Sequence, residues 1–188
     1  VIAPRSHLVV LIHYHPTGKP ETDRSSLALY LRDEPPTRLM TSVPLWTTRI
    51  DIPPGASQHE VEVFATLPAD VHAFGVVPHG HYLMRDIRLT AKLPDGTVRP
   101  LLRVDDWDFN WQGSYRYVKP IRLPRGTTLH AVAHYDNSSA NPGNPSSPPR
   151  RVRFGEGSND EMFGCFLHVI ADTPADHEAM RRKWPRAL

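Results

Sequence analysis

Histidines in close pairs are the residues of this sequence best suited to chemistry. Eleven of the 188 residues are histidine, and six of them form three pairs: His13 with His15, His79 with His81, and His130 with His134. Neutral imidazole is a common ligand of copper, zinc, iron and nickel. The pairs therefore predict a metal site, provided that the spacing and a third ligand suit one ion.

His79 and His81 have the most suitable spacing. They follow the apolar run Val76-Val77-Pro78, at the end of a predicted strand or within it. Residues two apart on a strand face the same side, so both imidazoles could bind one ion. Two surface histidines on a polar face would give the same pattern, so the spacing alone leaves both readings open.

The other two pairs are weaker candidates. Pro16 directly follows His15, which places His15 beyond the end of its predicted strand. His130 and His134 are four residues apart, farther than is ideal for two ligands of one ion on a strand. We expect both of them to be structural or surface residues.

Met162 could supply a third ligand. It follows Asp160-Glu161 and opens an apolar run, where a methionine is by default a core residue. A thioether beside two imidazoles forms a site that favours copper, because soft sulfur suits Cu(I) and nitrogen suits both oxidation states.

The elements that must position these residues are short strands. Twenty prolines argue against long helices, and alternating or β-rich runs predict strands at 8–14, 27–31, 61–65, 87–93, 98–104, 115–121, 128–135 and 161–170. We expect an all-β, antiparallel jelly-roll β-sandwich forming a single domain over residues 1–188. Thr173 before Pro174 predicts a short terminal helix over 173–182.

Composition narrows the function. The formal net charge is only +2 and no basic face is apparent, so nucleic acid is not expected as a partner. No apolar run is long enough to predict a membrane span. The single cysteine, Cys165, excludes an internal disulfide and a thiolate zinc cluster.

Several of these motifs together resemble one family. The strings Val71-His72-Ala73-Phe74, Pro78-His79-Gly80-His81-Tyr82-Leu83 and Asp160-Glu161-Met162, with Gly155 before the last, resemble the ascorbate-dependent type II copper monooxygenases. That family includes peptidylglycine α-hydroxylating monooxygenase and dopamine β-monooxygenase. The resemblance covers about residues 7–171 and is to the second, C-terminal domain, whose opening stretch is similar to Val9–Tyr14.

The resemblance implies a function and its cofactors. The family hydroxylates a C–H bond of a small-molecule substrate with O2 and with ascorbate as electron donor, and the intact enzyme uses two copper ions. Carried over, the oxygen-activating copper has the ligands His79, His81 and Met162. His13 would be one ligand of the second copper, completed by an N-terminal copper domain that this sequence lacks. A periplasmic or secreted location is expected.

This sequence departs from the family in two places. Phe163 stands where animal members have a disulfide cysteine, which indicates a bacterial-type member. Peptide-amidating members bind a substrate carboxylate through an arginine, an asparagine and a tyrosine. The corresponding positions here are Val77, Gly164 and Phe166. None of these three side chains can make a charge-assisted hydrogen bond to a carboxylate. We therefore expect a substrate pocket formed by Val77, Gly164 and Phe166 that suits an apolar or aromatic substrate and not a peptidylglycine.

Two other functions remain open. In a cupin-like iron or manganese dioxygenase, Asp86 would join His79 and His81, and Pro124-x-Gly126 before His130 would form the second motif. The chain could also be a non-catalytic, copper-binding sandwich domain.

The segment 105–112, with its two tryptophans and three acidic residues, could form a wall facing the substrate or pack over an edge of the sandwich.

Overall fold

The computed structural model describes residues 2, 5–10, 12, 14, 17–31, 33–34, 36 and 38–184. The chain divides into two compact units, Val1–Thr37 and Arg38–Leu188. In the first unit the described residues contain no strand or helix, so the strands expected at 8–14 and 27–31 were wrong there. Leu8 is 63% exposed and Tyr30 is 96% exposed. The described residues of these two β-rich stretches have neither a partner strand nor a buried face, and both are needed to stabilise a strand.

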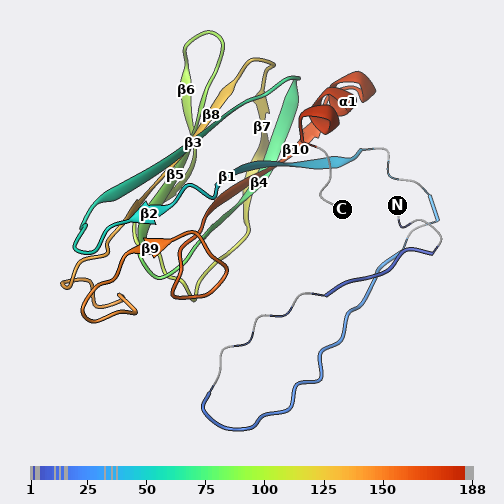
Figure 1. Ribbon diagram of the computed structural model, residues 1–188. Helices are drawn as coiled ribbons and strands as arrows, with labels where there is room; N and C mark the ends of the chain where they lie inside the picture. Colours follow the sequence, from blue (N-terminus) through green and yellow to red (C-terminus); the bar gives the residue numbers. More distant parts are fainter. Residues whose placement is uncertain are drawn as a thin grey trace. The chain divides into compact units, whose positions relative to one another are not determined.

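The second unit contains a jelly-roll β-sandwich (Figure 1). Its two four-stranded sheets have the orders β1-β10-β4-β7 and β3-β8-β5-β6, and β2 pairs with β9 in a small separate ladder. All these strand pairs are antiparallel. The strands are β1 (Met40–Thr47), β2 (Asp51–Ile52), β3 (His59–Thr66), β4 (Val71–Gly80), β5 (Met84–Lys92), β6 (Val98–Val104), β7 (Tyr115–Leu123), β8 (Thr128–Tyr135), β9 (Val152–Arg153) and β10 (Phe163–Ala171).

The alternation of each strand places one face in the core. On β8, Leu129, Ala131 and Ala133 are fully buried, whereas His130 and His134 face the other side. On β10, Cys165, Leu167 and Val169 are fully buried in the same way. Burying one face of each sheet against the other supplies the main stabilisation of such a sandwich.

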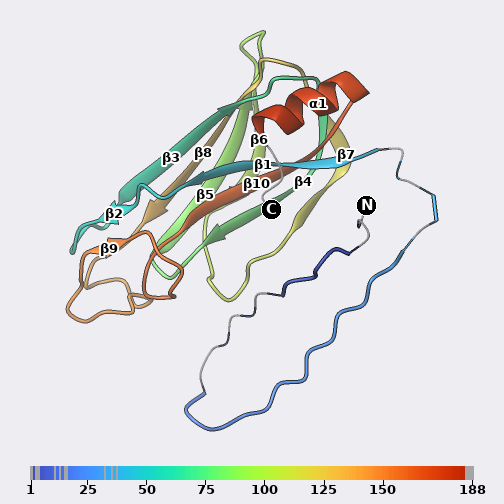
Figure 2. The same cartoon turned by 45° about the vertical axis from the view of Figure 1, so that its right-hand side comes forward.

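Most of the predicted elements of the second unit are confirmed. The six strands expected from residue 61 onward are present with small changes at their ends. Helix α1 (Pro174–Lys183) begins as expected, because the side chain of Thr173 accepts a hydrogen bond from the backbone N–H of Asp176. In Figure 2, α1 lies beside β10 and β1.

The structure adds an edge strand that the sequence did not predict. β1 contains Pro44, which lacks an N–H; within sheets proline is found mainly on edge strands, at the first residue of a strand or at bulges. β1 is indeed the outermost strand of its sheet and pairs with β10 alone.

Over the described residues, no helix has the length and apolar character needed to cross a membrane.

Candidate metal centre

His79 lies near the end of β4, on the outer face of the β1-β10-β4-β7 sheet. Its Nδ1 is 2.7 Å from Oε1 of Gln112, whose Nε2 donates to the carbonyl of Phe109 at 2.8 Å. Because the amide nitrogen of Gln112 is used in this way, its oxygen must accept from Nδ1–H of His79. The neutral imidazole therefore keeps its free lone pair on Nε2.

His81 follows the end of β4 and has the same tautomer. Its Nδ1 lies 3.0 Å from the carbonyl oxygen of Asp160, which can only accept, so Nε2 again keeps the lone pair. Burial lowers the pKa of His81 and the nearby His79 lowers it further, while hydrogen bonds of the ring with the backbone of Asp160 and of Gly157 act in the opposite direction. These effects together favour the neutral imidazole, which is the form that binds metals.

Met162 lies directly before β10 and meets His79 across the β4–β10 pair. Its Sδ is 3.3 Å from Nε2 of His79, and the rings of His79 and His81 are 5.3 Å apart and nearly perpendicular. The hydroxyl of the buried Tyr135 donates to the carbonyl of Met162 at 3.0 Å. The structure thus brings together all three of the ligands expected from the sequence.

Glu161 connects the two segments that bear these side chains. It is fully buried. Its Oε1 accepts from the backbone N–H groups of His81 and Met162, and its Oε2 accepts from that of Leu83 at 3.0 Å. Burial raises the pKa of Glu161 to about 7, although these N–H donors act in the opposite direction. One carboxyl group therefore fixes the backbone of His81 relative to that of Met162.

Gly80 has a steric role between the two histidines. A Cβ at this position would collide with the side chain of Met84, which is itself fully packed in the core. The middle residue of the His-Gly-His motif must therefore be small if β4 is to lie this close to β5.

The donors fit a soft metal ion. Two donor atoms that each lie about 2.0–2.3 Å from one ion are roughly 3–4 Å apart, and Nε2 of His79 and Sδ of Met162 have such a separation. Neither atom carries a hydrogen in the tautomer described above, so their approach is not a hydrogen bond. Two nitrogens and a thioether sulfur suit copper, and the sulfur favours Cu(I).

A site with a carboxylate ligand fits less well. Within the described part of the chain, no three His, Cys, Asp or Glu side chains are grouped so that they could hold a metal ion. The Asp86 carboxylate that a cupin-like site requires lies 2.9 Å from Nδ1 of His134, and His130 is stacked on Phe64 and paired with Glu62. Asp86 and His130, which a cupin-like site would require, therefore each have other partners.

The expected pocket residues share the outer face on which His79 lies. Gly164 on β10 pairs directly with His79 on β4, and Phe166 pairs with Val77. Directly opposed residues of neighbouring strands project to the same side of a sheet. Val77, Gly164 and Phe166 therefore lie beside the candidate metal ligands.

Segment 105–112 orients both histidines, a role that the sequence did not reveal. Trp107 is buried in the core, and Phe109 packs edge-on against His81 with ring centroids 5.7 Å apart. Gln112 at its end holds His79. The segment carries no metal-ligand motif of its own, so nothing in the sequence pointed to Gln112.

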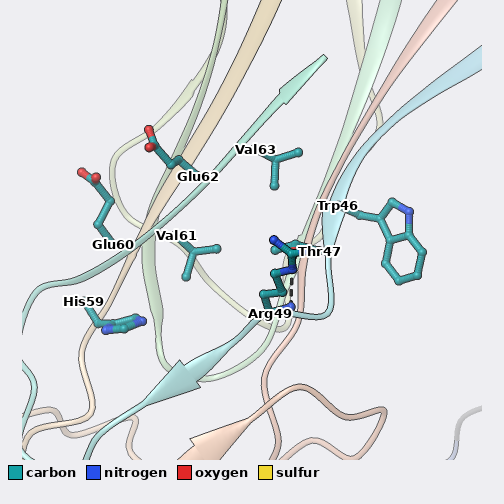
Figure 3. Close-up of a pocket in the computed structure, with 8 residues that line it drawn as sticks. All are labelled: Trp46, Thr47, Arg49, His59, Glu60, Val61, Glu62 and Val63. Carbon is teal, nitrogen blue, oxygen red and sulfur yellow. Dashed lines mark hydrogen bonds between the residues drawn. The ribbon is translucent and has the colours of Figure 1, made fainter.

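One expected ligand falls outside the described residues, and one cavity lies apart from this centre. His13 falls outside the described residues, so its assignment to a second copper stays a prediction. A cavity of about 380 Å³ opens between β1 and β3, lined by Arg49, His59, Glu60 and Val61 among others (Figure 3). It contains none of the three candidate metal ligands.

Comparison with models of known protein families and with curated protein sequences finds no match to this chain.

Proposed function

We propose that this protein is a copper-dependent monooxygenase that hydroxylates a C–H bond with O2 and ascorbate. The observation that supports the proposal most is the 3.3 Å approach of Nε2 of His79 to Sδ of Met162, with the ring of His81 beside that of His79 and both rings hydrogen-bonded through Nδ1 to groups outside the candidate site. Outer hydrogen bonds that fix the orientation of histidine ligands are typical of functional metal centres. The same residues resemble those of the type II copper monooxygenases, and the type of reaction is proposed from that resemblance.

In the proposed reaction, one atom of O2 enters the substrate and the other leaves as water. The C–H bond and the O–O bond break, and a C–O bond forms. Two electrons and two protons are also consumed, and two ascorbate molecules each give one electron. Copper, when bound, would supply the one-electron chemistry and activate O2.

The residues of the chain would position this chemistry. His79 and His81 would bind the metal through Nε2, and Met162 through Sδ. Gln112 and the carbonyl of Asp160 would keep both rings in the binding tautomer, and Glu161 would hold the two ligand segments together. The site lies on an outer sheet face beside Val77, Gly164 and Phe166, and none of these three residues bears a charge that could pair with a substrate carboxylate. A peptidylglycine is therefore not the proposed substrate.

The second candidate is a non-catalytic copper-binding domain. The same three donors support it, because they explain metal binding without requiring turnover. A cupin-like dioxygenase has less support, since Asp86 binds His134. Only an oxygenation assay separates the first two functions.

The test is incorporation of ¹⁸O from ¹⁸O2 by the copper-loaded chain with ascorbate, over a panel of small C–H substrates. We expect at least one product carrying a single ¹⁸O atom, formed at a low rate, because the second copper of the two-copper family has one candidate ligand here, His13, and this chain would be only part of the active enzyme. Product formation should require ascorbate, be lost in His81→Ala and persist in Met40→Ala, which removes an exposed thioether elsewhere. Copper binding without labelled product from any substrate would contradict the monooxygenase and favour the binding domain.

A further inference from the structure

Among the edge strands that the structure describes in the two four-stranded sheets, β3 alone has no proline. These edge strands are β1, β3, β6 and β7. Pro44 lies in β1, Pro100 in β6 and Pro120 in β7, whereas β3 contains neither proline nor lysine. A proline cannot donate a backbone hydrogen bond, and edge strands of natural proteins use proline and lysine to prevent the addition of another strand. β3 therefore lacks the protection that the other three edges have.

A cavity lies along the free edge of β3. Its volume is about 380 Å³, and the consecutive β3 residues 59–63 line it together with Trp46, Thr47 and Arg49 at and just after the end of β1. Successive side chains of a strand project to opposite faces of its sheet. A space that contacts every residue of such a run therefore lies beside the strand, next to the backbone groups that β8 does not pair with.

The two faces of β3 differ in charge. Figure 3 shows Val61 and Val63 on one side of the strand and Glu60 and Glu62 on the other. Val61 is buried in the core, and Val63 packs against it. Glu60 and Glu62 are exposed, and each carboxylate lies within 3.3 Å of a histidine ring on the outer face of β8. A strand added beside β3 would therefore meet apolar side chains on its inner face and carboxylates on its outer face.

These surroundings define the side chains of a strand that fits. Opposite charges on directly opposed residues stabilise a strand pair and like charges destabilise it, so Glu60 and Glu62 favour lysine or arginine at the outward positions. At the inward positions, Val61 and Val63 favour apolar side chains, and Arg49 on the opposite wall of the cavity disfavours a further cation. A second copy of β3 fits poorly, because antiparallel pairing of two β3 strands would gather the glutamates of both copies on one outer face.

We propose that the free edge of β3 binds an extended segment of a partner protein in which basic residues alternate with apolar ones. The segment adds to the β3-β8-β5-β6 sheet as a fifth strand and forms hydrogen bonds with the backbone of residues 59–63. In this mode of recognition, main-chain hydrogen bonds give the affinity and alternate side chains give the specificity. The interaction uses none of the candidate metal ligands, so it does not depend on the proposed function.

The test is binding of the peptide acetyl-Thr-Val-Lys-Val-Lys-Val-Thr-amide to the full 188-residue chain, measured by isothermal titration calorimetry. We expect saturable binding, and slower amide hydrogen exchange in residues 59–63 when the peptide is bound. Glutamate in place of both lysines should weaken binding about tenfold or more. Alternate residues of a bound strand direct their N–H groups toward β3. N-methylation of both lysines and N-methylation of the first two valines should therefore differ in effect, and only one of them should abolish binding.

A charge exchange tests the outward positions. The double variant Glu60→Lys/Glu62→Lys should bind the lysine peptide about tenfold more weakly and the glutamate peptide more tightly than the unchanged chain does. Asp106→Lys is the matched control, because it reverses an exposed charge just after β6, at the opposite edge of the sheet from β3. Its preference should equal that of the unchanged chain.

The proposal is overturned if the lysine peptide does not bind, if the two N-methylated peptides behave alike, or if the charge exchange leaves the preference unchanged. Dimerisation of the chain without peptide, with slower hydrogen exchange in residues 59–63, would also overturn it and would assign the free edge of β3 to a second copy.

Discussion

The Nε2 atom of His79 lies 3.3 Å from Sδ of Met162, although 83 positions separate the two residues in the sequence. The antiparallel register of β4 and β10 causes this proximity, because Gly80 pairs directly with Phe163. The neighbours of that pair, His79 and His81 on one segment and Met162 on the other, therefore converge at one end of the sheet.

Gln112 should control copper affinity without supporting the fold. In Gln112→Leu, His79 loses the acceptor that keeps its proton on Nδ1, and copper affinity should fall about 10- to 100-fold, as is typical when such an outer hydrogen bond is lost. Competition titration of Cu(I) with a chromogenic chelator measures the change. Asn110→Ala in the same exposed segment should bind copper normally. Equal affinities of Gln112→Leu and the unchanged chain would show that Gln112 has no such role.

Glu161 should contribute to stability as well as to the site. In Glu161→Gln, one oxygen becomes an N–H2 group that faces a backbone N–H of Leu83, His81 or Met162, so at least one buried donor loses its partner. The free energy of unfolding of the metal-free chain should fall by about 1–3 kcal/mol. Urea unfolding followed by tryptophan fluorescence measures it, with the exposed Glu156→Gln as control. A midpoint unchanged in Glu161→Gln would exclude the bridging role of this carboxyl group.

Asp86 should be dispensable for metal binding. Its carboxylate binds Nδ1 of His134, on the sheet that does not carry His79. Asp86→Ala should therefore retain the copper stoichiometry of the unchanged chain, measured by elemental analysis after dialysis. Loss of the metal in this variant would instead support the cupin-like site with two histidines and a carboxylate.

Cys165 should be unreactive until the sandwich unfolds. It is fully buried, and burial raises the pKa of its thiol to about 12, so almost no thiolate forms near neutral pH. Alkylation by iodoacetamide at pH 8 should be at least about 100-fold slower in the native chain than in urea above the unfolding midpoint. Because the chain has no other cysteine, mass spectrometry reports this site alone. Rapid labelling of the native chain would contradict the buried position.

Much of the sandwich could be predicted from local pattern. The alternation at 128–135 and at 87–93 predicted β8 and β5, because alternation depends on only a few neighbouring residues. β1 was missed because Pro44 argues against a strand unless the strand is known to be at an edge. The strands expected at 8–14 and 27–31 were wrong in the described residues, because β-rich composition does not reveal whether a partner strand exists.

The three candidate ligands could be predicted, whereas the residues that hold them could not. His79, His81 and Met162 are types with a known preference for metals. Gln112 and the carbonyl of Asp160 act only through their position in space, and neither residue type is specific to metal sites.

The most direct test of the account is the coordination of copper in the full chain. X-ray absorption of the Cu(I)-loaded chain should detect one sulfur and two nitrogen ligands on a single equivalent of copper. The sulfur contribution should vanish and the affinity fall in Met162→Ala, while Met40→Ala, which removes an exposed methionine of β1, should match the unchanged chain. A copper site without sulfur, or one unaffected by Met162→Ala, would contradict the assignment of His79, His81 and Met162 as its ligands.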